Sequence, residues 1–97
     1  MAMENKDVMV AYYNALPSAG QRMARTIADK LSNVGIFKTF GSVAHVITTE
    51  MEVMREEEPS NTAGQLHRQL NHLGVRSEAV VNLEQRVYER IRYEDAF

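Results

Sequence analysis

Apolar residues recur along most of the chain at three- and four-residue spacing, which is the period of one face of an α-helix. The first clear stripe, between residues 18 and 34, consists of Met23, Ile27, Leu31 and Val34. Polar residues fill the opposite side, as is typical of a helix that lies on a protein core. The sequence therefore predicts an amphipathic helix over 18–34.

Three more helices follow from the same spacing, over 42–57, 63–73 and 77–94. Their expected core positions are Val43, Val46, Ile47, Met51, Met54, Leu66, Leu70, Leu73, Val80, Leu83, Val87 and Ile91. A Ser side chain just before a helix accepts a hydrogen bond from a free backbone N–H group. We therefore expect Ser42 and Ser77 to cap the first and the last of these helices.

The same helix punctuation occurs twice in the chain. The two N-terminal motifs are Ser18-Ala19-Gly20-Gln21 and Thr62-Ala63-Gly64-Gln65. A Ser or Thr followed three residues later by Gln is a capping box, and Gly35 and Gly74 stand where a left-handed residue ends a helix. Because the helix interiors differ, we interpret the likeness as shared capping chemistry, with an internal repeat as the alternative.

The first segment, residues 7–16, is apolar on nearly every side and ends at Pro17. A short helix of this composition is buried in the core or covered by a partner, and a β-strand is the alternative because Val and Tyr favour strands. We expect a homodimer that buries Val8, Tyr12 and Leu16 against a second copy.

Two aromatic residues, Phe37 and Phe40, lie in the connector between two predicted helices. We expect both to fill the core, with a short strand over 36–40 as the alternative. Taken together, the pattern predicts an all-α fold of four or five short helices in a compact orthogonal or bundle-like arrangement. At 97 residues, the whole chain, 1–97, is expected to form one domain.

The net charge of −2 and the lack of a basic tail argue against a strong non-specific grip on nucleic acid. The absence of Cys excludes disulfides and thiolate chemistry and fits a reducing compartment. No apolar run reaches the length of a membrane span. We therefore expect a cytoplasmic protein that does not bind membranes.

The sequence contains no phosphate-binding Gly-rich loop, nucleophile elbow or zinc-protease motif. His67 and His72 are five residues apart, which places them about 140° apart on a helix. The pair is therefore expected to lie on a solvated helix rim, and His45, opposite the apolar arc of its helix, is expected to be exposed. We predict no enzyme activity, no metal and no cofactor.

Two carboxylates fall on apolar helix faces. Glu50 lies within the stripe of the helix over 42–57, and Glu84 within that of the helix over 77–94. Because an isolated buried charge is costly, each must find a donor or shift its pKa. They are either structural groups, ion-paired to an Arg of the same fold or brought to the edge by a rotation of the helix, or they form a paired acid site or a partner anchor.

Residues 62–90 have the punctuation of a helix-turn-helix, which would make the protein a DNA-binding transcription regulator. In that interpretation the DNA-binding residues are Arg76, Ser77, Asn82, Gln85 and Arg86. The residue four before the turn Gly74 is normally small, whereas here it is Leu70. We keep this function as the alternative.

Asn82, Arg86, Arg90 and Tyr93 form a stripe at about one-turn spacing, and Arg and Tyr are enriched at interface hot spots. The other interpretation is a solvated face on which Glu89 and Glu94 pair with the arginines. We predict a non-enzymatic protein-binding regulator, adaptor or inhibitor, of a kind found in bacteria or bacteriophages. The expected interface residues are Tyr12, Tyr13, Glu84, Arg86, Arg90 and Tyr93.

Overall fold

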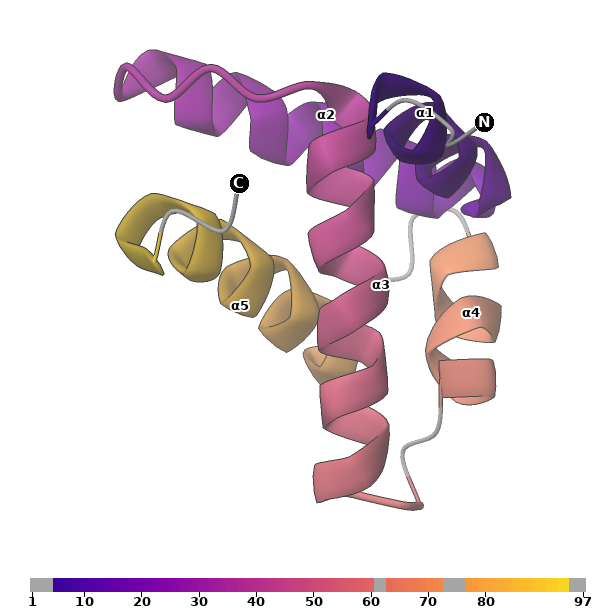
Figure 1. Ribbon diagram of the computed structural model, residues 1–97. Helices are drawn as coiled ribbons and strands as arrows, with labels where there is room; N and C mark the ends of the chain where they lie inside the picture. The colour runs from indigo at the N-terminus through magenta and orange to yellow at the C-terminus, as the bar shows by residue number, and fades with distance from the viewer. Residues whose placement is uncertain (1–4, 61–62, 73–76, 95–97) are drawn as a thin grey trace.

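A computed structural model describes residues 5–60, 63–72 and 77–94 (Figure 1). Within these ranges the regular structure is entirely α-helical, which confirms the predicted fold class. The five helices α1 to α5 span Asn5–Ala15, Ser18–Asn33, Phe40–Glu57, Ala63–Asn71 and Glu78–Glu94. The first segment is therefore a helix and not a strand.

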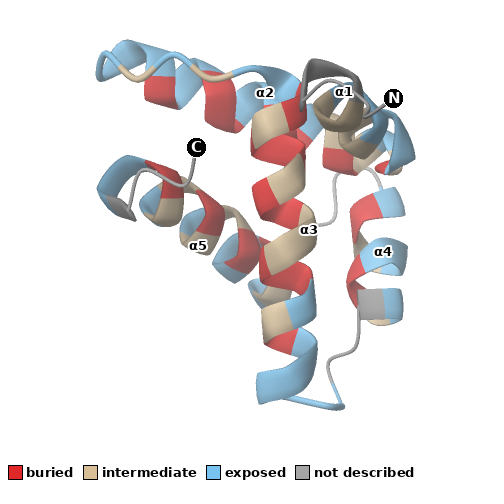
Figure 2. Ribbon diagram, in the orientation of Figure 1, coloured by how far each residue is buried: buried red, intermediate tan, exposed pale blue. Residues whose placement is uncertain are grey.

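Helix α3 is the centre of the fold, because each of the other four helices contacts it. Helices α2 and α5 lie across α3, whereas α4 runs beside it (Figure 1). The buried residues concentrate on α3 and on the faces that the other helices turn toward it (Figure 2). The arrangement is thus an orthogonal pack around one central helix.

The predicted apolar stripes form the core. The buried members are Met23, Ile27, Leu31, Val43, Val46, Ile47, Met51, Met54, Leu66, Leu70, Val80, Leu83, Val87 and Ile91. Val34 is an exception and is exposed, because α2 ends at Asn33 and the chain leaves the helical path there. Leu73 lies outside the described residues.

Helix α1 packs inward on its own chain. Leu16, just after the helix, is buried in the core, and Tyr12 is half-buried against it. Val8 is also half-buried. The core of the same chain therefore covers Leu16, and the expected homodimer stays a prediction for the half-buried Val8 and Tyr12.

The crossing of α1 and α3 depends on Gly41. A Cβ atom at this position would lie 2.2 Å from the carbonyl oxygen of Met9 and 2.4 Å from its carbonyl carbon. Both are backbone atoms, so no side-chain rotation could relieve the overlap. Only glycine lets α1 lie this close to the first turn of α3.

The predicted C-terminal stop of α2 is confirmed. Gly35 has a left-handed φ of 83°, and its N–H donates to the carbonyl of Ser32 at 3.0 Å. The N–H of Ile36 donates to the carbonyl of Leu31 at 2.8 Å, and Ile36 packs against the core. These are the two hydrogen bonds and the apolar contact of a Schellman motif. Its predicted counterpart at Gly74 lies outside the described residues.

The predicted capping box of α2 is wrong. Pro17 occupies the N-cap position with no side-chain cap, and Ser18 is already the first helical residue. The Gln21 side chain instead donates to the carbonyl of Tyr13 at 3.1 Å, which links α2 to the end of α1. The corresponding Thr62 lies outside the described residues.

Of the two predicted serine caps, the structure confirms one and contradicts the other. Thr39, and not Ser42, caps α3, because its Oγ1 accepts from the N–H of Ser42 at 3.1 Å. Ser77 caps α5 as predicted, and its Oγ accepts from the N–H of Val80 at 3.2 Å. Helix α3 therefore begins before the expected position, at Phe40.

Neither connector phenylalanine fills the core, which contradicts the prediction. Phe37 is 79% exposed and Phe40 is 45% exposed. Because α3 begins at Phe40, that side chain falls on an outer face of its first turn, while the connector runs back along α2 (Figure 1). Ile36 packs against the core instead.

Substituting Gly41 with Ala is expected to destabilise the fold by about 1–3 kcal/mol or more, because the added methyl group forces two helix backbones apart. Urea unfolding followed by circular dichroism measures this loss. Gly64→Ala, at an exposed position of α4, is the control and should be neutral or stabilising by up to about 1 kcal/mol. Equal unfolding midpoints for Gly41→Ala and wild type would contradict the close crossing.

Candidate functional site

Glu50 lies on the buried side of α3 and is only 6% exposed. Helix α5 supplies both of its partners. Nε of Arg86 donates to Oε1 of Glu50 at 3.1 Å, and Nη1 of Arg90 donates to Oε2 at 2.8 Å. Of the two interpretations of Glu50, the ion pair with arginines of the same fold is therefore confirmed.

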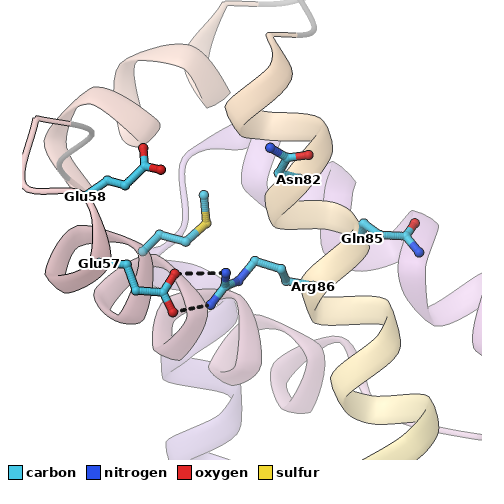
Figure 3. A pocket seen from close by; sticks show the side chains of 6 residues that line it. Glu57, Glu58, Asn82, Gln85 and Arg86 are labelled. Atoms are coloured by element: carbon cyan, nitrogen blue, oxygen red, sulfur yellow. Dashed lines mark hydrogen bonds and ion pairs between the residues drawn. The ribbon is translucent and has the colours of Figure 1, made fainter.

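Arg86 also binds the last residue of α3. Its Nη1 and Nη2 donate to the two carboxylate oxygens of Glu57 at 3.1 and 3.3 Å (Figure 3). These hydrogen bonds are the main reason that the pKa of Arg86 lies above its ordinary value, and those to Glu50 add to the effect against the opposing influence of burial. We call Glu50, Glu57, Arg86 and Arg90 the arginine cluster.

Two surface hollows flank Arg86. The first has a volume of about 280 Å³ and is lined by Met54, Glu57, Glu58, Asn82, Gln85 and Arg86. Figure 3 shows it between the end of α3 and the middle of α5, with Gln85 pointing away from the Glu57–Arg86 pair. The second has a volume of about 340 Å³ and is lined by Glu50, Arg86, Glu89, Arg90 and Tyr93.

Tyr93 forms the rim of the second hollow and is 71% exposed. The guanidinium of Arg92 lies 5.2 Å from the centre of its ring and 5.9 Å from that of Tyr88. At these distances an Arg is attracted by the face of an aromatic ring. Helix α5 thus presents an accessible aromatic side chain with an arginine beside its ring.

The structure brings together only part of the predicted protein interface. Arg86, Arg90 and Tyr93 line one hollow. Glu84 instead binds Nζ of Lys30 on α2 at 2.9 Å, so a lysine of the same chain neutralises it. Glu89, which was expected to pair with the arginines, accepts a hydrogen bond from Gln85 at 2.7 Å. The side chain of Glu94 lies outside the part of the chain that the structure describes.

The two predicted tyrosines of α1 lie in other contacts. Tyr12 packs edge-on against His45, with ring centres 4.6 Å apart. Tyr13 packs against Phe40 and accepts a hydrogen bond from Arg25 through its hydroxyl. The expected exposure of His45 is wrong, because α1 covers it; burial lowers its pKa, and the charge of Arg90 acts in the same direction.

Of the residues expected to bind DNA, some are exposed and others are bound within the fold. Asn82 and Gln85 are exposed. Ser77 caps α5 and donates to Oε1 of Gln69 at 3.0 Å, while Arg86 binds two carboxylates. Arg76 lies outside the described residues. Leu70 is buried in the core as expected.

The described part of the chain places no group of three or more His, Asp or Glu residues where they could hold a metal ion. His67 and His72 are exposed, as expected for a solvated rim. None of the described helices combines the length and the apolar content needed to cross a bilayer.

A second surface escaped sequence analysis. An apolar hollow of about 470 Å³ lies between α1 and the start of α3, lined by Met9, Val10, Tyr13, Thr39, Phe40, Gly41 and Ser42. A neighbouring hollow of about 360 Å³ shares Thr39 and Phe40 with it and is lined further by Phe37, Lys38 and residues of α2. We call these two hollows together the phenylalanine surface. The sequence feature at this surface is the pair of aromatic residues in the connector, Phe37 and Phe40, which the sequence analysis expects to fill the core.

Comparison of the chain with protein-family models, with curated proteins and with solved structures gives no match. The candidate site therefore has to be judged on its own geometry.

Substituting Glu50 with Gln is expected to cost about 1–3 kcal/mol, because it leaves two partly exposed arginines without the buried charge that they bind. Glu52→Gln on the same helix is the matched control. Its partner Arg55 and Glu52 itself are both more than half exposed, so that pair contributes little. Chemical denaturation of the two variants measures the difference, and similar midpoints would show that the arginine cluster is not needed for stability.

His45 predicts a dependence of stability on pH. Its native pKa lies below the ordinary value of 6.5, so the unfolded chain takes up the proton first as the pH falls. The contribution of His45 to the free energy of unfolding is therefore fully present above pH 6.5. It is lost as the pH falls from 6.5 through the lowered native pKa. Wild type should lose more stability than His45→Gln between pH 7.5 and 5.5, as measured by urea unfolding. Equal losses would exclude a role for His45.

Proposed function

We propose that this protein is a non-enzymatic protein-binding regulator, adaptor or inhibitor, and that its partner binds the hollow lined by Arg90 and Tyr93 on α5. The observation that carries the proposal is an exposed tyrosine beside two arginines that a buried carboxylate already holds in place. These residue types are enriched in the hot spots of protein interfaces.

Preorganisation is the physical basis of this proposal. A flexible Arg loses side-chain entropy when it is immobilised on binding, and this loss lowers affinity. Glu50 restrains Arg86 and Arg90 before any partner arrives. The ring of Tyr93 adds a rigid apolar contact area at the rim of the same hollow.

The structure alters the role that the sequence assigned to Arg86. Three of its nitrogen atoms donate to Glu50 and Glu57. A partner that took these hydrogen bonds would leave the carboxylate of Glu50 with less compensation. We therefore assign Arg86 to holding α5 on α3 and Tyr93 to the partner, with Arg90 linking the two, since it binds Glu50 and lines the same hollow as Tyr93.

The helix-turn-helix regulator remains the alternative. The exposure of Asn82 and Gln85 supports it, because side chains at the surface can reach base edges, although Gln85 also donates to Glu89. Two features weigh against it, namely the carboxylate partners of Arg86 and the presence of Glu57 and Glu58 beside Asn82 in the first hollow. Negative charge at that place repels a phosphate backbone.

The cytoplasmic location and the bacterial or bacteriophage setting expected from the sequence belong to the same proposal. Self-association also remains part of it, with Leu16 outside the contact because the core of the same chain buries it.

Affinity capture from the host extract, with immobilised protein and nuclease-treated and untreated samples, tests the partner site. Tyr93→Ala should weaken retention of a stoichiometric protein by about 5- to 150-fold, which corresponds to 1–3 kcal/mol, and should leave the circular dichroism spectrum unchanged. Val81→Ala, an exposed apolar residue elsewhere on α5, is the control and should retain full binding.

Two outcomes would contradict the proposal. Equal retention by Tyr93→Ala and wild type would exclude the hollow as the partner site. Capture that disappears with nuclease, together with a steep salt dependence of duplex DNA binding that Arg86→Ala flattens by about one unit of slope, would establish the DNA-binding alternative.

A further inference from the structure

The phenylalanine surface leaves large apolar side chains in water. Phe37, Phe40 and Val10 are among the most exposed large hydrophobic residues in the described part of the chain. Phe40 lines both hollows of this surface, so the exposed apolar side chains run from Val10 on α1 to Phe37 in the connector. A continuous patch of this kind marks a contact with another molecule.

We infer that the phenylalanine surface is the contact of a two-fold symmetric homodimer, in which a second copy of this chain covers Phe37 and Phe40. The first argument is shape. Phe37 projects into solvent on the same surface that contains an apolar hollow of about 470 Å³. A two-fold axis brings each surface against its own copy, so a projection on one protomer meets a hollow on the other.

The second argument is charge. The ionisable side chains that line the two hollows are Asp29 and Lys38 in one and Tyr13 in the other. Opposite charges at one surface let two identical copies approach without net repulsion. The end of α3, with Glu52, Glu56, Glu57 and Glu58 close together in sequence, would repel its own copy. Of the phenylalanine surface and the acidic end of α3, the phenylalanine surface is therefore the one that fits a second copy.

The third argument is area. An aromatic side chain buries about 150–250 Å² when it is fully covered, and each protomer contributes two phenylalanines that are only partly covered. With Val10 and the rims of the hollows, the dimer contact is expected to bury no more than about 1,200 Å² in total, the range of weak and transient interfaces. A contact of this kind is reversible, so the dimer is expected to dissociate on dilution.

The dimer contact is independent of the partner site proposed on α5. The hollows of the phenylalanine surface share no lining residue with the two hollows beside Arg86. In addition, α2 lies between the connector and α5 (Figure 1). A dimer formed in this way therefore leaves both copies of the partner site open.

Sedimentation velocity of the full chain, over a concentration range from about 1 μM to 1 mM, tests the inference. Wild type should change from the mass of one chain to that of two. Phe37→Lys should raise the dimer dissociation constant at least about tenfold, because it would bury a charged lysine in the apolar hollow of the other copy. Val81→Lys, which places the same charge on an exposed position of α5, should dimerise like wild type.

Circular dichroism and thermal unfolding of Phe37→Lys verify that the variant folds, and Phe37→Ser provides a second, uncharged disruption. Three results would overturn the inference: a monomer at every concentration, a dimer that neither Phe37 variant weakens, or a dimer that Val81→Lys disrupts. Retention of the α5 partner by monomeric Phe37→Lys would show that the two contacts are separate. The dimer contact and the partner site on α5 are therefore tested independently, and a negative result for Tyr93→Ala does not decide whether the dimer forms.

Discussion

The structure depends on the neutralisation of one buried charge. Glu50 lies on the helix that every other helix contacts, and a carboxylate in this position is costly without charged donors. Arg86 and Arg90 stand four residues apart on α5, so both point to the same side of that helix and reach one carboxylate. A rotation or a shift of α5 by one residue would remove both partners. The ion pairs therefore set the register of α5 on α3, which apolar contacts alone leave less specific.

Helix positions and core residues were predictable because they follow from a local rule. Residues three and four apart share a face of a helix, so the stripe from Val80 to Ile91 identifies its own buried side wherever the helix packs. The errors arose where a neighbour in space decides the outcome. His45 is covered by α1, and Ser18 lost its capping role to Pro17, which occupies the N-cap position.

The candidate site was predictable only in part, for the same physical reason. The spacing of Arg86, Arg90 and Tyr93 placed them on one face of α5, and the apolar surroundings of Glu50 marked it as a group that needs a partner. No sequence pattern showed that Glu50 is the partner of these arginines, because 36 residues separate Glu50 from Arg86. The exposure of Phe37 was equally hidden, because an aromatic in a connector is more often buried than exposed.

The contact between Gly41 and Met9 has an evolutionary consequence that differs between its two sides. Position 41 has to remain glycine in any relative that keeps α1 against α3, because even one carbon atom meets backbone. Position 9 contributes mainly its carbonyl group, which every amino acid carries, so this contact places little demand on the identity of its side chain. A contact between two side chains permits compensating changes on both partners, whereas this one permits change on one partner only. In an alignment of such relatives, covariation would therefore miss a contact that fixes the position of an entire helix.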